Sequence, residues 1–428
     1  MHPVPQQRQT RSADALILFV SGCLALLPYL VYHDFFARLF WFGDEFDLID
    51  QIDHLGLWKW MWLMFAENFV PLFKGLWGGE VLLFGGSYAA MIATLWITHA
   101  VNVALLGKVM RTCGLSWTAV FLAQVAFGLT PGNIETLAWS VQWSAVLAMT
   151  FMLLALDVFF TSQAKGASLA WITASALSFS RGVLTGLLVA AGALFPREGE
   201  SASRFPRRVF AAGVFLAPSV IVAILIATIA SGNHQHMAGH AGDAAAFGTW
   251  YWGLNPLHFL LSVESVGWRT VTALGALKLA LIVWAIARSR GRIRLLFLLL
   301  VAFDLGNAVL LGIGRFNTGF PATMSSRYQY ASLVGIVPLA GYLLSRVVER
   351  LPFSRIASGV LVAGLLGALG LSMIRGWSAD ADSFTRWRGT DSRRVILQDL
   401  STDTQAVPGI PGMTMDRARE LVAKYRLH

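Results

Sequence analysis

Residues 14–33 read DALILFVSGCLALLPYLVYH, an apolar run long enough to cross a bilayer as one helix. The hydrocarbon core is about 30 Å thick and needs roughly 20 apolar residues of helix. Similar runs recur along the chain, which has 428 residues, of which 56% are hydrophobic and 13% charged. Ordinary soluble domains have about 25% charged residues. The composition therefore predicts an all-α polytopic transmembrane helical bundle and argues against a soluble protein.

We predict about 11 membrane spans. The segments are 14–33, 88–107, 115–130, 138–160, 168–180, 183–195, 208–231, 271–287, 295–313, 329–345 and 356–374. The count is open by one at 168–195, because Ser178–Gly182 interrupts the apolar run there. Lysines and arginines gather in alternate short loops, a pattern that predicts a cytoplasmic N-terminus and an outer, periplasmic C-terminus. This topology also accounts for the net charge of +9, so we predict no nucleic-acid partner.

The first predicted outer loop, residues 34–87, has its own helical pattern. Asp47, Asp50 and Asp53 recur every three residues with aliphatic residues between them, which places the acids on one side of a helix. Tryptophans follow at 58, 60 and 62. We expect amphipathic helices lying in the outer interface. The chain then divides into a membrane module, residues 1–375, and a small soluble tail, residues 376–428, on the outer side.

Acidic residues directly follow the first span, at Asp44, Glu45 and Asp47. A carboxyl group held against apolar surroundings has a raised pKa and suits general acid or base catalysis. The alternative is a solvated helix N-terminus, where acids favour the helix dipole. The sequence alone leaves both interpretations open.

Two further polar groups lie in predicted outer segments. Glu67, Asn68 and Lys74 belong to the first loop, where Lys74 meets a phosphate or extends its ammonium group from an interfacial helix to water. Glu135 and Gln142 are seven residues apart, so we expect them to share one helix face with Trp139 between them. That face would bind substrate or form hydrogen bonds between helices.

Arginines near the predicted outer ends of spans suit a phosphate, because a guanidinium group matches phosphate oxygens. The candidates are Arg181, Arg315 and Arg327, with Tyr328 beside the last. The alternative is an ion pair between Asp304 and Arg315 or Arg327. Histidines at 234, 236 and 240 with Asp243 could bind zinc, but no matched ligand set accompanies them, so we predict no metal site.

Together these residues resemble the GT-C superfamily of membrane glycosyltransferases, which use polyprenyl-phosphate-linked sugars. Asp44-Glu45 is similar to the acidic motif after the first span of that superfamily. The segment from Glu67 to Lys74, the segment from Pro131 to Gln142, and Ser326-Arg327-Tyr328 are similar to patches of its bacterial members. The order of these patches and their shared side of the membrane carry the resemblance.

The resemblance implies an inverting transfer of sugar from a polyprenyl-phosphate donor to a glycan or glycolipid acceptor, at the outer face of a bacterial inner membrane. Asp44 would be the catalytic base, with Glu45 or Asp47 orienting it or binding acceptor. The implied substrate- and phosphate-binding residues are Glu67, Lys74, Glu135, Gln142, Arg181, Arg315, Arg327 and Tyr328. No metal or other cofactor is implied. The alternatives are a polytopic transporter or lipid flippase, or an enzyme similar to O-antigen ligases and polymerases.

Overall fold

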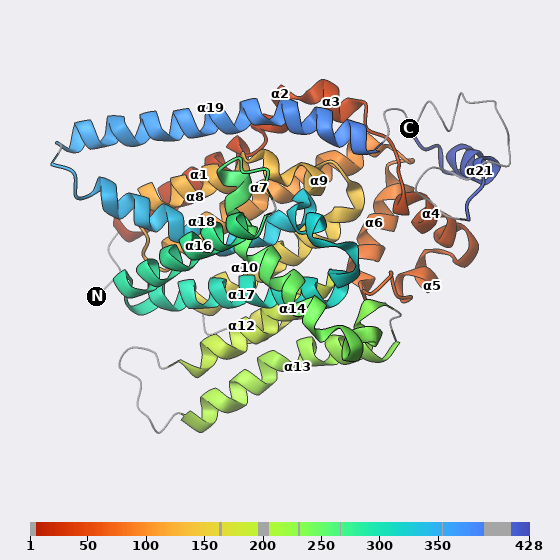
Figure 1. The fold of residues 1–428 in the computed structure, drawn as a ribbon, viewed down its shortest axis with the longest axis horizontal. Helices are drawn as coiled ribbons and strands as arrows, with labels where there is room; N and C mark the ends of the chain where they lie inside the picture. The colour runs from red at the N-terminus through yellow and green to blue at the C-terminus, as the bar shows by residue number, and fades with distance from the viewer. Residues whose placement is uncertain are drawn as a thin grey trace.

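The computed structural model describes residues 6–161, 165–195, 205–229, 232–265, 267–352, 354–388 and 412–428. Within these ranges all regular structure is helical, apart from an isolated bridge between Phe65 and Asn68. Eight helical segments are long and apolar enough to cross a membrane. The chain is therefore a helical membrane protein, and Figure 1 shows most of its long helices running side by side.

Eight of the predicted spans coincide with these long segments. The helices concerned are α1 (Gln6–Leu24) with α2 (Leu27–Val31), α7 (Tyr88–Thr112), α10 (Trp143–Thr161), α13 (Phe205–Ile229), α16 (Trp268–Arg288), α17 (Gly291–Arg315), α18 (Gln329–Val348) and α19 (Arg355–Arg388). The other three predicted spans are the 12-residue helices α8 (Trp117–Gly128), α11 (Lys165–Ala176) and α12 (Val183–Leu194). Twelve residues of helix rise only about 18 Å. The count of eleven stays a prediction.

The two ends of the bundle differ in what they carry. At one end lie the N-terminus and the basic turn that joins α16 to α17, from Arg288 to Arg294 (Figure 1). At the other end lie α4 (Asp44–Leu55), α5 (Leu57–Met61), α6 (Pro71–Leu83) and α21 (Met415–Tyr425). We call the second the loop end. Every predicted site residue belongs to the loop end, and which end faces the cytoplasm stays a prediction.

Helices α11 and α12 form a short hairpin whose tip, the 3-10 turn η3 (Ser180–Gly182), lies inside the bundle. Ser175, near the tip, donates a hydrogen bond of 2.8 Å to the carbonyl of Ala148, which lies beyond the first turn of α10. The segment of residues 34–87, which the sequence predicted to be the first outer loop, reaches inward to meet this tip. The Leu72 amide donates to the Leu177 carbonyl at 3.2 Å, and the Ser180 amide donates to Asn68 Oδ1 at 3.3 Å.

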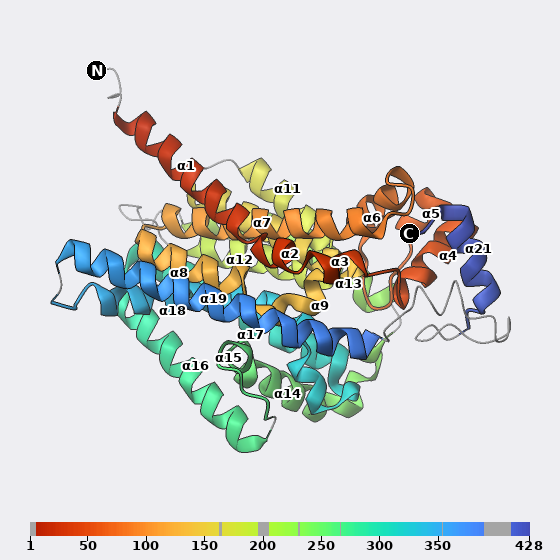
Figure 2. The ribbon, with the colours of Figure 1, turned by 90° about the horizontal axis from the view of Figure 1, so that it is seen from above.

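Helix α14 (Met237–Leu254) lies between the predicted spans 208–231 and 271–287, where the sequence predicted no span. It packs against both α16 and α17 near the loop end (Figure 2). Small residues permit the close approach to α17, because a Cβ on Gly312 would lie 2.4 Å from the carbonyl oxygen of Ala244. The alanine- and glycine-rich composition of α14 hid it from a search for apolar spans.

The amphipathic helix predicted in the first outer loop is present as α4. Its apolar side is buried, and Asp50 and Asp53 on its other side bind the basic helix α21. Arg417 Nε lies 2.7 Å from Asp50, and Arg417 Nη2 lies 2.9 Å from Asp53. Burial acts to raise the pKa of Asp53, but hydrogen bonds from Lys424, Arg417 and Tyr425 lower it to about 2.

The predicted division at residue 375 falls inside α19, which continues to Arg388. Trp377, beyond that division, is fully buried and donates a hydrogen bond of 2.8 Å to the Leu129 carbonyl. The residues described beyond 375 therefore pack on the membrane module, through α19 and through α21. The sequence suggested a separate tail because its composition becomes polar there, but charge pairing with α4 joins α21 to the rest.

Gly182 is required by the closeness of the two hairpin helices. A Cβ at this position would lie 1.9 Å from the carbonyl oxygen of Ser175. We expect Gly182→Ala to destabilise the protein by about 1–3 kcal/mol through overpacking. Thermal unfolding in detergent measures this as a lower Tm. Gly213→Ala in α13, where an added Cβ meets nothing within 4 Å, is the matched control and should not lower Tm. Equal Tm values for the two variants would contradict the close packing.

Candidate functional site

The candidate site lies at the loop end, where α4, α10, α12 and α18 begin and α17 ends. Helix N-termini carry partial positive charge, so this end of the bundle favours anions. The predicted residues separate into three kinds here. Asp44, Asp47, Arg181, Arg315, Arg327 and Tyr328 are grouped around the site, Glu45 and Lys74 are buried structural groups, and Glu135 holds a loop in place.

Glu45 is a buried structural carboxylate. Its side chain is 0% exposed and accepts hydrogen bonds from the Phe42 amide at 2.7 Å and the Tyr88 hydroxyl at 3.0 Å. It also accepts from the Ser140 amide at 3.1 Å and the Ser140 hydroxyl at 2.6 Å. These donors come from the turn before α4, from α7 and from the 3-10 turn η2 (Ser140–Gln142) just before α10. Glu45 therefore fixes α4 to the bundle, and its carboxylate has no room for a substrate.

Asp44 lies at the start of α4, next to Glu45, and its side chain reaches solvent. Gly43 before it has φ +55° and ψ −128°, a conformation that glycine adopts readily and that turns the chain into the helix. The surrounding protein raises the pKa of Asp44 by desolvation, while the positive charges of Arg327 and then Arg315 act to lower it. Asp44 thus belongs to the same electrostatic site as the two arginines.

Asp47 lies one turn after Asp44 on the exposed side of α4. It accepts a hydrogen bond of 2.7 Å from Gln51. Desolvation raises its pKa most, followed by the negative charges of Asp44 and Asp50. Asp47 is therefore accessible to an acceptor and coupled in charge to Asp44.

Arg181 opens into a cavity of about 70 Å³. Its side chain is 4% exposed, and its buried Nε and Nη1 atoms have no hydrogen-bond partner. Asn68, Asn307 and Tyr328 also line this cavity, and the Tyr328 hydroxyl is likewise buried without a hydrogen-bond partner. Buried donors without acceptors are costly. We call this space the Arg181 cavity, and its unpaired donors match the oxygens of an anion.

Arg315 borders the Arg181 cavity at the end of α17 and remains partly exposed. Its Nη1 lies 3.6 Å from Glu67 Oε2, so the predicted phosphate ligand Glu67 acts here as a partner of Arg315. Gly314 permits this approach, because a Cβ there would lie 3.0 Å from the Glu67 carboxylate. The pair joins the first outer loop to α17.

Arg327 and Tyr328 lie in the 3-10 turn η8 (Ser326–Tyr328) before α18. Glu135 fixes this turn, since its Oε2 accepts a hydrogen bond of 2.6 Å from the Ser325 hydroxyl and one of 2.8 Å from the Arg327 amide. The Arg327 guanidinium lies over the Tyr328 ring at 5.1 Å, and its Nε is buried without a hydrogen-bond partner. Glu135 therefore positions Arg327.

The prediction that Glu135, Trp139 and Gln142 share one helix face was wrong. Glu135 belongs to the single turn α9 (Ile134–Leu137), whereas Gln142 belongs to the 3-10 turn η2 (Ser140–Gln142). Trp139 between them is extended, with φ −135° and ψ 113°. The break allows the Ser140 amide to reach Glu45. Gln142 is half-buried at the start of α10.

Lys74 does not line the Arg181 cavity, and it does not extend to water either. It is 0% exposed, and its ammonium group donates to the carbonyls of Trp60 at 2.8 Å and Leu63 at 3.1 Å. Burial lowers its pKa to about 8, against the negative charge of Asp47, which acts to raise it. Lys74 therefore ties the segment after α5 to α6.

Tyr251 of α14 supports the site, although the sequence did not indicate it. Its hydroxyl donates a hydrogen bond of 2.8 Å to the Tyr328 carbonyl and accepts one of 2.8 Å from Asn307. Asn307 in turn lines the Arg181 cavity. For Asn307 the sequence offered a signal, because an asparagine inside a predicted apolar span indicates a polar site. Tyr251 gave no signal, because α14 was not recognised as a helix.

The proposed pairing of Asp304 with Arg315 or Arg327 was also wrong. Asp304 lies 2.6 Å from Lys278 and accepts a hydrogen bond of 2.6 Å from Ser332. Lys278 also donates to the carbonyls of Asn255 at 2.6 Å and Trp252 at 3.0 Å. Both charged side chains are fully buried, so this pair holds α16, α17 and α18 together within the bundle.

Within the histidine group, His240 Nδ1 lies 2.9 Å from the Asp243 carboxylate, and the His240 ring stacks on Phe316 with a centroid distance of 5.0 Å. Across the part of the chain that the structure describes, no three His, Cys, Asp or Glu residues are arranged to hold a metal ion. A comparison with protein-family models found no match, and a comparison with curated proteins found none either. The functional argument therefore rests on the geometry of the site.

The free energy of unfolding distinguishes the buried structural role of Glu45 from the accessible position of Asp44. In Glu45→Gln the amide group faces at least one of the buried donors, so we expect a loss of about 1–3 kcal/mol in the free energy of unfolding. Asp44→Asn changes an accessible side chain and should stay within about 0.5 kcal/mol of the wild type. Thermal unfolding in detergent compares the two. A Glu45→Gln protein with unchanged Tm would contradict the structural role of Glu45.

Proposed function

We propose that this protein is a membrane glycosyltransferase of the GT-C type with about eleven spans. It transfers a sugar from a polyprenyl-phosphate donor to a glycan or glycolipid acceptor at the outer face of a bacterial inner membrane. In this proposal the loop end faces outward, the N-terminus is cytoplasmic and the C-terminus periplasmic. The observation that carries the proposal is the placement of Asp44 in the electrostatic site of Arg315 and Arg327, of which Arg315 also lines the Arg181 cavity.

In the proposed reaction Asp44 accepts the proton of the acceptor hydroxyl. The acceptor oxygen then bonds to the anomeric carbon of the sugar while the bond from that carbon to the phosphate oxygen breaks. The electron pair leaves with the polyprenyl phosphate, and the configuration at the anomeric carbon inverts. Arg181, Arg315 and Arg327 stabilise the charge that develops on the leaving phosphate, as fixed cations do at such centres. No step requires a metal ion.

The pKa of Asp44 suits this role. Desolvation raises it above the ordinary aspartate value, which makes the carboxylate a stronger base. The positive charges of Arg327 and Arg315 act in the opposite direction and favour the ionised form of Asp44. Asp47 is accessible one turn away and is the proposed acceptor ligand, while Glu45 positions the helix that carries both.

A transporter would use charged groups within the bundle, and Lys278 with Asp304 is a fully buried charged pair there. That pair is fully buried and bonded to backbone carbonyls and to Ser332. It does not line the Arg181 cavity. The geometry therefore favours chemistry at the loop end over passage through the bundle.

We expect Asp44→Asn to lower kcat for sugar transfer by about 100-fold or more, because a positioned base contributes roughly 10²–10⁴-fold. The measurement is release of undecaprenyl phosphate from a panel of undecaprenyl-phosphate sugars in liposomes, followed by mass spectrometry. Asp34→Asn, at an exposed position before the site, is the matched control and should retain full turnover. Full turnover by a folded Asp44→Asn protein would refute the proposed function.

Removing Arg327 should change the pH dependence of the reaction. Its positive charge lowers the pKa of Asp44, so Arg327→Gln should raise that pKa further. The base works when deprotonated, and therefore the acid limb of kcat/KM should move to higher pH while the activity also falls. Arg346→Gln, at the opposite end of α18, should leave the limb in place. An acid limb at the same pH in Arg327→Gln would show that Arg327 does not act on the pKa of the catalytic base.

A further inference from the structure

Six exposed arginines gather at the end of the bundle that lies opposite the loop end. Four of them belong to the turn that joins α16 to α17, and two belong to the last turn of α18 and the residues just after it. We call them the arginine patch, and its members are Arg288, Arg290, Arg292, Arg294, Arg346 and Arg350.

Contacts between distant segments bring the two parts of the patch together. The Tyr342 hydroxyl of α18 donates a hydrogen bond of 2.9 Å to the Arg288 carbonyl. The Arg346 guanidinium lies 5.2 Å from the centroid of the same Tyr342 ring. Tyr342 also packs edge to face on Phe297 of α17, with ring centroids 5.3 Å apart. One buried tyrosine therefore holds Arg346 beside the turn that carries four further arginines.

The positive charge of the patch is largely unbalanced. Arg346 lies 3.0 Å from Glu349, in a pair whose two side chains are about half exposed. Such an exposed pair contributes little free energy. Within the part of the chain that the structure describes, none of the other five arginines has a carboxylate within 4 Å. The N-terminus of α17, which begins at Gly291 in the middle of the patch, adds further positive potential.

Exposed apolar side chains continue the surface from the patch along the helices. Trp284 lies one turn before Arg288 on α16, and Leu344 and Val347 lie beside Arg346 on α18. These helices are long and apolar enough to cross a membrane, and tryptophan favours the level of the lipid headgroups. Guanidinium groups match phosphate oxygens. A cationic rim above exposed carbon therefore matches an amphiphile with an anionic head better than it matches a soluble anion.

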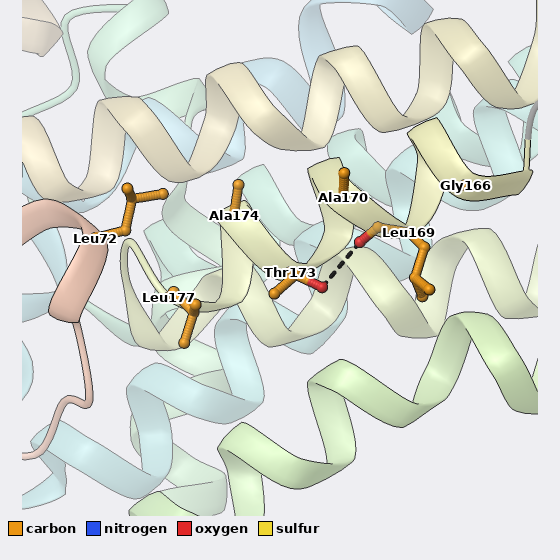
Figure 3. A pocket seen from close by; sticks show the side chains of 7 residues that line it. All are labelled: Leu72, Gly166, Leu169, Ala170, Thr173, Ala174 and Leu177. Carbon is orange, nitrogen blue, oxygen red and sulfur yellow. Dashed lines mark hydrogen bonds between the residues drawn. The ribbon is translucent and has the colours of Figure 1, made fainter.

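A groove of about 510 Å³ along α11 is an exposed surface of the opposite kind. Of the seven residues that line it, Thr173 alone has a polar side chain (Figure 3). The Thr173 hydroxyl donates to the Leu169 carbonyl at 2.9 Å, so it is already bonded within the helix. A lipid against this groove meets carbon, which does not distinguish one headgroup from another. Fixed charge of the kind that the arginine patch carries does distinguish them.

We propose that the arginine patch binds the headgroup of an anionic phospholipid whose acyl chains lie along the exposed side chains of α16 and α18. Basic surfaces between membrane helices hold phospholipid headgroups by this chemistry. The bias of basic residues toward cytoplasmic loops accounts for each loop by itself. It does not require the contacts of Tyr342, which join two loops into one patch. The proposal is independent of the proposed sugar transfer.

The test is native mass spectrometry of the whole chain in detergent, titrated with dioleoyl phosphatidylglycerol or with dioleoyl phosphatidylcholine. The two lipids have the same acyl chains, and only the first has a net negative headgroup. We expect the Kd of the first bound phosphatidylglycerol to be at least about tenfold lower, since each basic residue near an anionic surface strengthens binding by roughly fivefold. Equal Kd values for the two lipids would overturn the proposal, and this comparison needs no variant.

A double variant locates the binding site. Arg290→Gln with Arg292→Gln should weaken the binding of phosphatidylglycerol by at least about tenfold and leave phosphatidylcholine unchanged. Lys59→Gln with Arg269→Gln removes the same charge from exposed positions outside the patch and is the matched control, which should keep the preference. A preference that persists in the first variant, or that falls equally in both, would overturn the assignment to the arginine patch.

A soluble competitor separates a lipid from a free phosphate. sn-Glycerol 3-phosphate has the charged phosphate without acyl chains, so at equal concentration it should not displace phosphatidylglycerol from the wild-type protein. Complete displacement would overturn the assignment of a lipid. Sugar transfer does not enter any of these measurements, so their failure would leave the proposed function untouched, and loss of the proposed function would leave the arginine patch untouched.

Discussion

A backbone turn buried inside a helical bundle must find partners in protein, because the bilayer offers its amide and carbonyl groups none. The turn between α11 and α12 is buried in this way. Residues of the segment 34–87 form hydrogen bonds with its amide and carbonyl groups. This constraint draws the segment around Asn68 and Leu72 into the bundle. Glu67 then reaches Arg315, and Arg181 is enclosed in a small cavity. The position of the loop end therefore follows from the hydrogen bonds of one short hairpin.

Helix α4 is held on two sides by charges that differ in environment. On its inner side the buried carboxylate of Glu45 accepts hydrogen bonds from Tyr88 of α7 and from Ser140 of η2. On its outer side Asp50 and Asp53 bind α21 at the protein surface. The low pKa of Asp53 means that this outer attachment contributes stability above pH about 4 and loses it as pH falls toward about 2. Asp44 therefore stays accessible at the start of a helix that is attached to the protein on both sides.

The Arg181 cavity brings charged groups to the loop end, with Arg181, Arg315 and Glu67 among its lining residues. Burying guanidinium nitrogens without hydrogen-bond partners is unfavourable, so an anion that pairs with the Arg181 nitrogens gains more there than it would in water.

The sequence by itself determined the helical membrane class, because the length of an apolar run is a local property. It also determined the amphipathic pattern of α4. A polar residue near the end of an apolar span can be recognised from that segment alone, which is how the sequence indicated the candidates Asp44, Arg181, Arg315, Arg327 and Tyr328. The family and the reaction stay hypotheses at both levels. The candidate residues could be identified from the sequence, but the residues that they contact in the folded protein could not.

Only the tertiary structure decided which of two adjacent acids is buried and which is accessible, because the donors to Glu45 come from Tyr88 and Ser140, far along the chain. It likewise placed Lys74 against backbone carbonyls and paired Asp304 with Lys278. Helix α14 was hidden because close packing with α17, rather than apolar length, stabilises it. Roles that depend on partners from distant segments cannot be read from local spacing, since burial and hydrogen bonding are set where those segments meet.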